Sequence, residues 1–377
     1  MRILVDLLGY TGGRGGTETY VRELLPRLAE EMPDADFVAL TGASGAAGVR
    51  KFFPGEVRVV EWVGDGRASW AAGEIVAVER TAKAMDADLV WSPANFGPLR
   101  EGVVPRVVSV HDVIYHEVPG EGLERLARAV TAWLMTRTAR TARAVVTVSA
   151  TAASAIHEHL GVPRERITVV HNGGSDIRGV DDPWRLLAPL GILPGRPVLL
   201  STGNRMPHKN FAGLLAAVAR IPADQRPLTV IGGGGADDPL RQTVERLGLA
   251  ADVVLPGWVS DDQLRALYQV ADVYVCPSLT EGFGLPVVDA LGAGVPVVAH
   301  ETEVLREVGG EWARYADATD PAVFARAILA VMSLDDGERA ALRTGGREWA
   351  GRFSWSAAAI ALSVVLRRTA ARRNSRG

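Results

Sequence analysis

The sequence predicts an α/β fold of two doubly wound domains that face each other across a cleft. Short apolar runs alternate with helical patterns along all 377 residues. Most runs are apolar throughout, which is typical of strands buried on both faces of a parallel sheet. The stretch Asn172–Pro197, rich in glycine, proline and aspartate, interrupts this rhythm once. It indicates a linker, so we expect a first domain over residues 1–176 and a second over residues 177–354.

Twelve runs are predicted as strands, seven before the linker and five after it. The first seven are Ile3–Leu7, Phe37–Leu40, Val57–Trp62, Leu89–Ser92, Val107–His111, Val145–Ser149 and Thr168–His171. The other five are Val198–Ser201, Leu228–Ile231, Val253–Leu255, Val273–Cys276 and Val295–Ala299. Helical patterns fill the intervals, and Trp355–Arg368 has the spacing of an amphipathic helix.

Composition narrows the class of protein. There are 44 acidic and 41 basic residues, so the basic excess of a general nucleic-acid binder is missing. The single cysteine, Cys276, excludes an internal disulfide and lies in a predicted buried strand. No apolar stretch reaches the length of a membrane span, and the N-terminus is predicted as a first strand rather than a signal peptide. We therefore expect a cytoplasmic protein, with a peripheral contact at the inner membrane face left open.

The clearest candidate site follows the predicted strand that ends near Cys276. Glu281 precedes a predicted helix start, where the amides of Phe283, Gly284 and Leu285 would point outward and bind phosphate. Asp289 lies one turn further along. The two carboxylates would flank a diphosphate that carries a hydroxyl-rich group on each side. The alternative is that both acids only cap the helix.

Two cations follow the predicted strand Val198–Ser201. Arg205 offers a two-pronged donor and Lys209 a point charge, and both chemistries suit phosphate oxygens. Together they would neutralise a leaving nucleoside diphosphate. The alternative is a pair of solvated loop cations.

Two features of the first half point to the same end of the strands. Gly12-Gly-Arg14-Gly15-Gly16 would let backbone approach a ligand, but its spacing fails the dinucleotide-binding pattern, as does that of Gly232–Asp238. His111 ends a predicted strand and would place an imidazole at the cleft; a hydrogen-bonded strand-end histidine is the alternative.

Weaker signals are read as structural. Asp34-Ala-Asp36 and Asp86-Ala-Asp88 resemble a metal-binding motif but precede strands, at the wrong end for a site. The arginine-rich stretch Leu123–Arg143 would suit an anionic membrane or acceptor, although a solvated helix face is favoured. No metal ligand set is predicted.

Taken in order, these segments resemble the retaining glycosyltransferases of the GT-B fold, specifically family 4. The resemblance covers almost the whole chain. It rests on these motifs: Gly15-Gly16-Thr-Glu18, His111-Asp112, Val146–Ser149, Val169–Gly173, Arg205 with Lys209, Gly257-Trp-Val259, Pro277-Ser278, Glu281–Pro286 and Phe353-Ser-Trp355.

The resemblance implies a role for each matched residue. Gly15, Gly16, Arg205 and Lys209 would hold the diphosphate, and Glu281 the donor sugar. Gly257, Trp258 and Val259 would line the base pocket, Asp289 would bind ribose where the family usually has Glu, and His111 would sit by the anomeric carbon. No metal or other cofactor is implied, and the helix over residues 355–377 would pack back on the first domain.

The implied function is transfer of a sugar from a nucleoside-diphosphate sugar to an acceptor hydroxyl, in polysaccharide or secondary-metabolite biosynthesis. The acceptor would be a small molecule, a lipid-linked molecule or a glycan, met by Arg14, Tyr20, Phe96 and Tyr115. A catalytically silent partner subunit, an inverting enzyme and a nucleotide-sugar epimerase are the alternatives. The nucleotide, the sugar and the oligomeric state are left open.

Overall fold

The structure, a computed structural model, describes residues 1–10, 12–13, 15–117 and 122–374. Arg14 lies outside them. The chain divides into two compact units, unit 1 (Met1–Gly173 with Ser354–Gly377) and unit 2 (Gly174–Phe353). The first boundary therefore precedes Gly174 instead of following residue 176. Most of the expected linker belongs to unit 2, where its short helix α7 (Pro183–Leu187) packs on helix α10 (Asp261–Val270).

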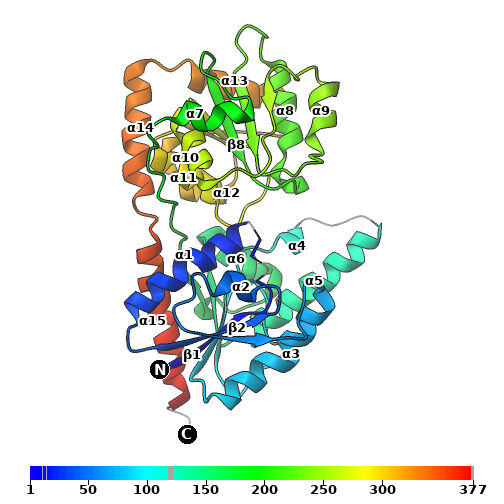
Figure 1. The fold of residues 1–377 in the computed structure, drawn as a ribbon, viewed down its shortest axis with the longest axis vertical. Coiled ribbons are helices and arrows are strands. Elements are labelled where there is room, and N and C mark those ends of the chain that lie inside the picture. Colours follow the sequence, from blue (N-terminus) through cyan, green and yellow to red (C-terminus); the bar gives the residue numbers. More distant parts are fainter. Residues whose placement is uncertain (11, 14, 118–121, 375–377) are drawn as a thin grey trace. The chain divides into compact units, whose positions relative to one another are not determined.

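Unit 1 is built on a seven-stranded parallel sheet in the order β3-β2-β1-β4-β5-β6-β7 (Figure 1). Its strands are β1 (Arg2–Leu7), β2 (Asp36–Gly42), β3 (Glu56–Val60), β4 (Leu89–Ser92), β5 (Arg106–Ser109), β6 (Ala144–Thr147) and β7 (Ile167–Val169). The chain reverses its direction across the sheet between β1 and β4. In such folds ligands bind beyond the carboxyl ends of the two strands at this switch point.

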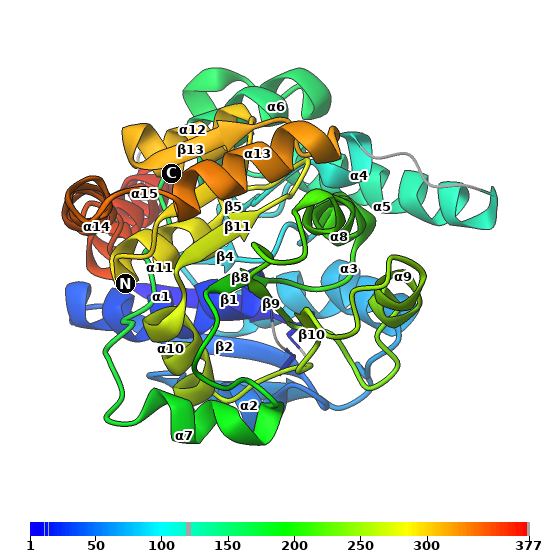
Figure 2. The same ribbon diagram turned by 90° about the horizontal axis from the view of Figure 1, so that it is seen from above.

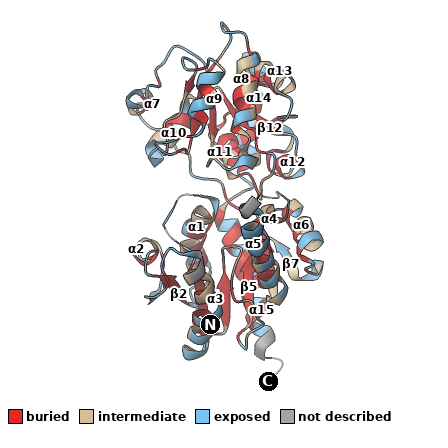
Figure 3. Ribbon diagram, turned by 90° about the vertical axis from the view of Figure 1, so that its right-hand side faces the viewer, coloured by how far each residue is buried: buried red, intermediate tan, exposed pale blue. Residues whose placement is uncertain are grey.

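Helices cover both faces of the unit 1 sheet. They are α1 (Gly16–Glu31), α2 (Ala46–Val49), α3 (Arg67–Ala84), α4 (Ile114–Glu117), α5 (Gly122–Thr141), α6 (Ala150–Leu160) and α15 (Trp355–Asn374). Apolar residues of α3 form one core with β1 and β2, and those of α5 and α6 form another with β5 and β6. Figure 3 shows the result, with the strands buried and the outer helix faces exposed.

Unit 2 is likewise built on a parallel sheet, with six strands in the order β10-β9-β8-β11-β12-β13. The strands are β8 (Val198–Thr202), β9 (Leu228–Gly232), β10 (Val253–Val254), β11 (Val273–Cys276), β12 (Val297–His300) and β13 (Ala313–Ala316). With α7 and α10, its helices are α8 (Phe211–Arg220), α9 (Leu240–Arg246), α11 (Leu285–Ala293), α12 (Glu303–Gly309), α13 (Pro321–Met332) and α14 (Asp336–Ala350). Helices α8, α9 and α13 share one core with the sheet, on the face opposite α10 and α11 (Figure 2). The switch point lies between β8 and β11.

Each of the twelve predicted strands overlaps an observed one, and the doubly wound α/β prediction is confirmed. The strand β13 was missed, because Ala-Arg-Tyr-Ala lacks the β-branched run that marks the others. Strand β5 ends at Ser109 and not at His111 as predicted. The carbonyl of Ser109 accepts from the Asn95 amide at 2.8 Å, and the His111 amide turns to the Asn95 side chain at 2.6 Å.

The expectation that no segment has the character of a membrane span needs correction. Asp336–Ala371 contains one window that is long and apolar enough by length and composition, and 44% of that window is buried. The segment is broken, however, because α14 ends at Ala350 and α15 begins at Trp355. Helix α15 packs along α1 within unit 1, with the rings of Trp355 and Tyr20 6.1 Å apart.

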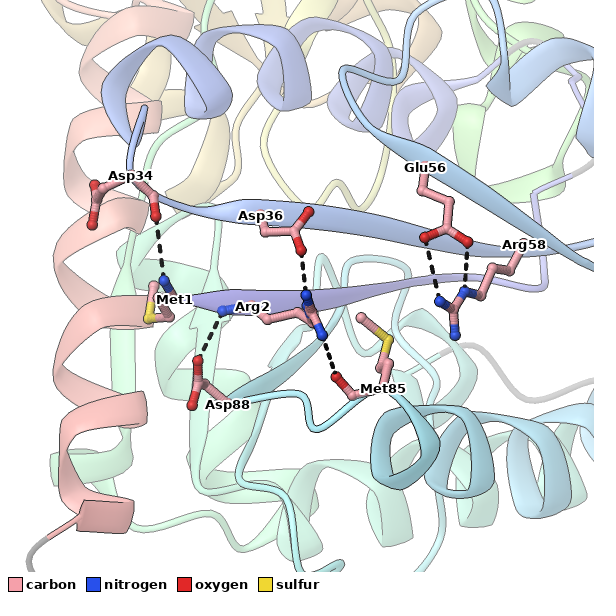
Figure 4. Close-up of polar contacts among 8 residues, drawn as sticks. All are labelled: Met1, Arg2, Asp34, Asp36, Glu56, Arg58, Met85 and Asp88. Atoms are coloured by element: carbon pink, nitrogen blue, oxygen red, sulfur yellow. Dashed lines mark hydrogen bonds and ion pairs between the residues drawn. The ribbon is translucent and has the colours of Figure 1, made fainter.

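The two Asp-Ala-Asp motifs lie at the amino-terminal edge of the unit 1 sheet, as their sequence position predicted. Figure 4 shows Arg2 donating to Asp36 through Nε and to Asp88 through its backbone amide, each at 2.8 Å. The carbonyl of Asp34 accepts from the N-terminal amine at 3.2 Å. These acids therefore tie the starts of neighbouring strands together, on the edge opposite the switch point.

Candidate functional site

Lys209 and Glu281 meet at the switch point of unit 2. Lys209 ends a short 3-10 turn after β8, and Glu281 follows β11, the strand hydrogen-bonded to β8. Their side chains form an ion pair, with Lys209 Nζ 2.6 Å from Glu281 Oε1, and are 16% and 11% exposed. A further bond, from the Leu279 amide to the His208 carbonyl at 2.8 Å, joins the two loops. The loops that carry Lys209 and Glu281 are therefore in contact, as the sequence predicted.

The start of α11 stands beside this pair. Gly284 precedes the helix with φ of 99°, and a Cβ there would lie 3.0 Å from Leu305 Cδ2, so the position requires glycine. Phe283 is buried with its ring 5.6 Å from that of Phe353, which anchors the loop. Leu285 is the first residue of the helix. The helix start therefore lies at the carboxyl edge of the sheet, the location that phosphate binding by these amides needs.

Asp289 is buried, and its carboxylate holds the first residues of unit 2. Oδ1 accepts from the Ser175 amide at 2.6 Å and Oδ2 from the Ser175 hydroxyl at 3.2 Å. Sequence reasoning missed this contact, because the two residues are 114 positions apart. A carboxylate accepts about four hydrogen bonds in all. The ribose role of Asp289 stays a prediction, and anchoring of Ser175 is the function that the geometry displays.

Arg205 differs from the sequence prediction of an open phosphate ligand. Its Nε and Nη2 donate to the Asp238 carboxylate at 2.7–3.0 Å. Nη1 donates to the carbonyls of Gly203 and Gly232, and Nη2 also to that of Ile231, all at 2.9–3.1 Å. A guanidinium has five N–H donors, and this network uses all five. In this arrangement Arg205 holds loops together instead of presenting donors to an anion.

Asp238 was not singled out from the sequence and is the acid of this network. Its side chain is 1% exposed. Burial alone would raise the pKa of Asp238, but hydrogen bonds from Arg205 and from the Leu240 amide lower it below its usual value. The sequence shows an aspartate at the end of a four-glycine loop, but this pattern does not identify Arg205 as its partner.

That loop, here called the unit 2 glycine loop (residues 232–238), packs closely against its neighbours. The Gly203 amide donates to the Gly232 carbonyl at 3.2 Å, and the Gly233 amide to the Gly257 carbonyl at 2.8 Å. Gly233 and Gly257 have φ of 96° and 75°. Three strand ends are thus joined through glycine backbone, beside the predicted base pocket of Gly257, Trp258 and Val259.

Trp258 in that predicted pocket is 50% exposed. A half-exposed indole next to a fixed glycine backbone offers an aromatic face and backbone polar groups together. Stacking on such a face suits a flat base. The assignment of this segment to base binding remains a prediction.

In unit 1, His111 lies just beyond β5 and is buried. Its Nε2 is 2.7 Å from the Pro93 carbonyl, and its ring meets that of Tyr20 edge-on at 4.6 Å between centroids. Because a carbonyl only accepts, Nε2 carries the proton and Nδ1 is an acceptor. Burial lowers the pKa of His111, against a smaller opposing effect of the Pro93 bond. The imidazole is therefore neutral near pH 7, which the strand-end alternative also anticipates.

The unit 1 glycine loop (residues 12–16, of which Arg14 is outside the described residues) is open. Gly15 and Gly16 are exposed at the start of α1. A Cβ at Gly15 would have its nearest neighbour, Glu18 Oε2, at 3.6 Å, and one at Gly16 would have none within 4 Å among the described atoms. Local packing does not explain these two glycines.

A buried carboxyl pair at the unit 1 switch point was also missed. Asp6 near the end of β1 accepts from the Ser92 hydroxyl at 2.9 Å, and Glu74 of α3 accepts from Trp70 Nε1 at 2.9 Å. Burial raises the pKa of Glu74 well above its usual value, and the neighbouring Asp6 raises it further. The pair therefore holds a proton that two exposed acids would lose.

Two other predictions concern reactive or metal-binding groups. Cys276 is buried, and burial raises its pKa to about 11, so it is a thiol of the strand as expected. Among the described residues, no group of three or more His, Cys, Asp or Glu side chains is arranged to hold a metal ion.

Two family descriptions match the chain in sequence. "Glycosyltransferase Family 4" matches residues 14–174, and "Glycosyl transferases group 1" matches residues 184–349. The two matches follow the division into units 1 and 2, and together they leave out only the ends and a short interval.

Two curated glycosyltransferases are similar to the chain in sequence. The chain is 34% identical over 220 residues to O-antigen chain mannosyltransferase B of Escherichia coli, covering 57% of this chain and 58% of that protein. It is 32% identical over 241 residues to MMP alpha-(1->4)-mannosyltransferase of Mycolicibacterium hassiacum, covering 63% and 56%. The chain thus spans little more than half the length of these curated relatives.

A solved structure shows the same fold over the full length. HepE of Anabaena, in complex with UDP and glucose, superimposes with a TM-score of 0.71 at 21% identity and covers 100% of this chain and 99% of its own. The matches in sequence and in fold agree with the resemblance found in the motifs. The chain belongs to the family 4 glycosyltransferases, with the two Rossmann-like domains of the GT-B fold.

Proposed function

We propose that the chain transfers a sugar from a nucleoside-diphosphate sugar to an acceptor hydroxyl and retains the anomeric configuration. The observation that carries the proposal is the Lys209–Glu281 pair at the unit 2 switch point, beside the start of α11. A cation, a carboxylate and a helix N-terminus are the groups that a diphosphate sugar needs. The names of the two mannosyltransferases and the UDP and glucose bound to HepE support it.

Lys209 would compensate the charge that grows on the leaving diphosphate. A positive charge fixed where negative charge develops stabilises the transition state more than the ground state. Glu281, held by Lys209 at 2.6 Å, would accept hydrogen bonds from sugar hydroxyls. The amides of Gly284 and Leu285 would face the phosphate, while the ring of Phe283 keeps the loop in place.

The proposed reaction breaks the bond between the anomeric carbon and the phosphate oxygen and forms one to the acceptor oxygen on the same face. The acceptor proton passes to the leaving phosphate, so no protein base is required. The neutral His111 would contribute an imidazole dipole near the anomeric carbon rather than a positive charge. The products are an α-glycoside and a nucleoside diphosphate, with no metal or cofactor involved.

The remaining roles follow from position. Trp258 and its neighbours would hold the base, and Asp289 the ribose, alongside its bond to Ser175. Arg205 would act through the loops it joins and not through the phosphate. The relative named for an O-antigen chain favours polysaccharide synthesis, with a glycan or lipid-linked acceptor. A cytoplasmic location is part of the proposal and does not rest on that name.

A panel of nucleoside diphosphates and their sugars tests the proposal by thermal shift, with and without a chelator. Ligands that bind the folded protein raise its melting temperature, by an amount that grows with affinity. We expect one nucleotide to stand out and the chelator to leave its shift unchanged. A shift that the chelator removes contradicts the metal-free part, and no shift from any nucleotide contradicts the whole.

Lys209→Ala then separates an enzyme from a silent partner subunit. We expect kcat/KM to fall at least about 100-fold, which corresponds to ~2.7 kcal/mol of transition-state stabilisation. The matched control is Lys83→Ala, which breaks an ion pair of similar length, 3.1 Å to Glu79, on α3. NMR of the product's anomeric proton distinguishes retention from inversion, and free sugar or an epimerised donor would favour the epimerase.

A further inference from the structure

The loop between β4 and β5 contains an asparagine in an uncommon backbone conformation. Asn95 has φ of 65°, in the left-handed region. Few residues other than glycine adopt this region readily, and asparagine is one of them. The next residue anchors the loop, because the ring of Phe96 meets that of Trp70 edge-on at 4.9 Å between centroids. Asn95 is therefore held in a turn that is fixed on unit 1.

Asn95 makes two hydrogen bonds to the segment in which β5 ends. Its backbone amide donates to the Ser109 carbonyl at 2.8 Å, and its side-chain Oδ1 accepts from the His111 amide at 2.6 Å. Since a backbone N–H only donates, the oxygen of the carboxamide must face His111. The two bonds hold the residues on either side of Val110. They therefore set the direction in which the chain leaves the sheet at His111.

The ring of His111 is held separately from its backbone. Nε2 donates to the carbonyl of Pro93, two residues before Asn95, at 2.7 Å. The ring of Tyr20 lies against the imidazole, with 4.6 Å between centroids, and the Tyr20 hydroxyl is 3.0 Å from Ser109 Oγ. His111 is 8% exposed. One short loop thus supplies a contact to the backbone of His111 and another to its ring nitrogen.

A purely structural role for Asn95 is the alternative. A buried backbone amide needs an acceptor, and the carboxamide meets that need. A turn with φ of 65° does not itself need this side chain, since glycine adopts the same conformation. The carboxamide adds one specific bond, and its partner is the histidine that the proposed function places beside the anomeric carbon.

We propose that Asn95 is a positioning residue for the sugar transfer, which fixes the location of the His111 imidazole through the His111 backbone amide. The inference rests on the proposed function, in which His111 acts near the reacting carbon. A misplacement of about 1 Å can cost on the order of 100-fold in rate. Donor binding should not depend on Asn95, because the proposed diphosphate site at Lys209 and Glu281 belongs to unit 2.

Two substitutions of Asn95 separate the side-chain bond from the turn. Asn95→Gly keeps the backbone conformation and removes the acceptor, whereas Asn95→Asp keeps an oxygen acceptor and also tolerates positive φ. We expect Asn95→Gly to lower kcat at least about tenfold and to leave the donor KM and the nucleotide-induced thermal shift unchanged. Asn95→Asp should recover most of the lost kcat.

Asp86→Gly is the matched control for the backbone change. Asp86 is exposed, has φ of 49° and lies after α3, at the amino-terminal edge of the sheet. Its replacement by glycine changes the freedom of the chain in the same way but touches no group near His111. We expect kcat to stay unchanged in this variant.

Nitrogen NMR of the histidine rings adds a readout that does not depend on activity. The chain has seven histidines, and His111→Gln identifies the His111 signals. We expect the wild type to show a neutral ring with its proton on Nε2, Asn95→Gly to shift or broaden these signals, and Asn95→Asp to restore them. Wild-type kcat with unchanged His111 signals in Asn95→Gly overturns the proposal.

Equal losses of kcat in Asn95→Gly and Asp86→Gly, in step with their melting temperatures, would assign Asn95 to stability alone and also overturn it. Failure of the proposed function has a different signature. The wild type would then show no transfer and no nucleotide-induced shift, while the NMR signals would still report whether Asn95 holds the ring of His111 in place.

Discussion

The two units have the same strand order around their switch points but differ in their glycine-rich loops. The loop of unit 2 is held by neighbouring groups, and the loop of unit 1 is exposed. In unit 2 the loop over residues 232–238 is packed against two other strand ends and held by the Arg205–Asp238 ion pair. In unit 1 the loop over residues 12–16 is exposed at Gly15 and Gly16. The buried pair beside it, Asp6 and Glu74, consists of two acids that hold a proton between them, and is not an ion pair.

The glycines therefore have different reasons to be glycine. A Cβ at Gly234 would lie 2.8 Å from Arg205 Nη2, and one at Gly257 would lie 3.2 Å from the Gly234 carbonyl. Packing excludes side chains there. At Gly16 nothing among the described atoms comes within 4 Å of the same position. A glycine that the fold requires says little about a ligand, whereas Gly15 and Gly16 leave room for a ligand to approach the backbone.

The largest expected effect on stability comes from breaking the ion pair that holds the unit 2 glycine loop. Asp238→Ala removes one partner of a buried ion pair and leaves the Arg205 charge uncompensated, which costs about 3–5 kcal/mol in unfolding free energy. Urea unfolding measures it. Asp237→Ala, at the exposed neighbouring residue, is the control and should cost less than ~0.5 kcal/mol.

A double variant sharpens this result. Arg205→Met combined with Asp238→Ala removes both charges and should recover part of the lost stability, because no buried charge remains unpaired. If Arg205→Met alone lowers nucleotide affinity and leaves stability intact, the arginine contacts phosphate directly and the positioning role is wrong.

The second effect concerns the buried acids Asp6 and Glu74 of unit 1 and depends on pH. The folded-state pKa of Glu74 is raised by burial and by Asp6, so the folded protein binds this proton more tightly than the unfolded chain. Stability is then fully present below the ordinary carboxyl pKa and is lost as pH rises through the raised one. The slope is at most ~1.4 kcal/mol per pH unit for one proton.

Glu74→Gln should flatten this slope as pH rises from the ordinary carboxyl range through the raised pKa of Glu74. The amide keeps an oxygen for Trp70 Nε1, which donates to Glu74 at 2.9 Å, and an N–H for Asp6. Thermal unfolding across the range measures the slope, with Glu61→Gln as an exposed carboxylate control. An unchanged slope in Glu74→Gln would show that another group controls the pH dependence.

The strands were predictable from the pattern of apolar residues. The contact of Lys209 with Glu281 was predictable from the order of the strands in the sheet. Apolar runs define parallel strands, and residues that follow neighbouring strands in such a sheet must converge at its carboxyl edge. Lys209 and Glu281 are 72 positions apart and still meet for this reason.

The contacts of Arg205, Asp238 and Asp289 were not predictable from one sequence. The sequence around a loop arginine looks the same whether its N–H donors face a ligand or three backbone carbonyls. The difference lies in backbone geometry, such as the positive φ of Gly233, which turns the neighbouring carbonyls toward Arg205. The buried pair Asp6 and Glu74 was hidden for a related reason, since each acid belongs to a different element and burial is a property of the assembled unit.

The smallest effect on stability is expected for substitutions in the unit 1 glycine loop. These substitutions are also the most informative about function. Gly15→Ala with Gly16→Ala should change unfolding free energy by less than ~0.5 kcal/mol. Among the described atoms only Glu18 Oε2 comes within 4 Å of an added methyl group, at 3.6 Å from that of residue 15, and Gly15 has an extended backbone with φ of 166°. If a diphosphate approaches this backbone, the same methyl groups should lower kcat/KM about tenfold or more, ~1.4 kcal/mol. Gly64→Ala, another exposed glycine with open space around it, is the matched control for both measurements. Equal activity of the two variants would leave the unit 1 loop without a role in donor binding, and a stability loss in the double variant alone would mean that its glycines serve the fold as those of unit 2 do.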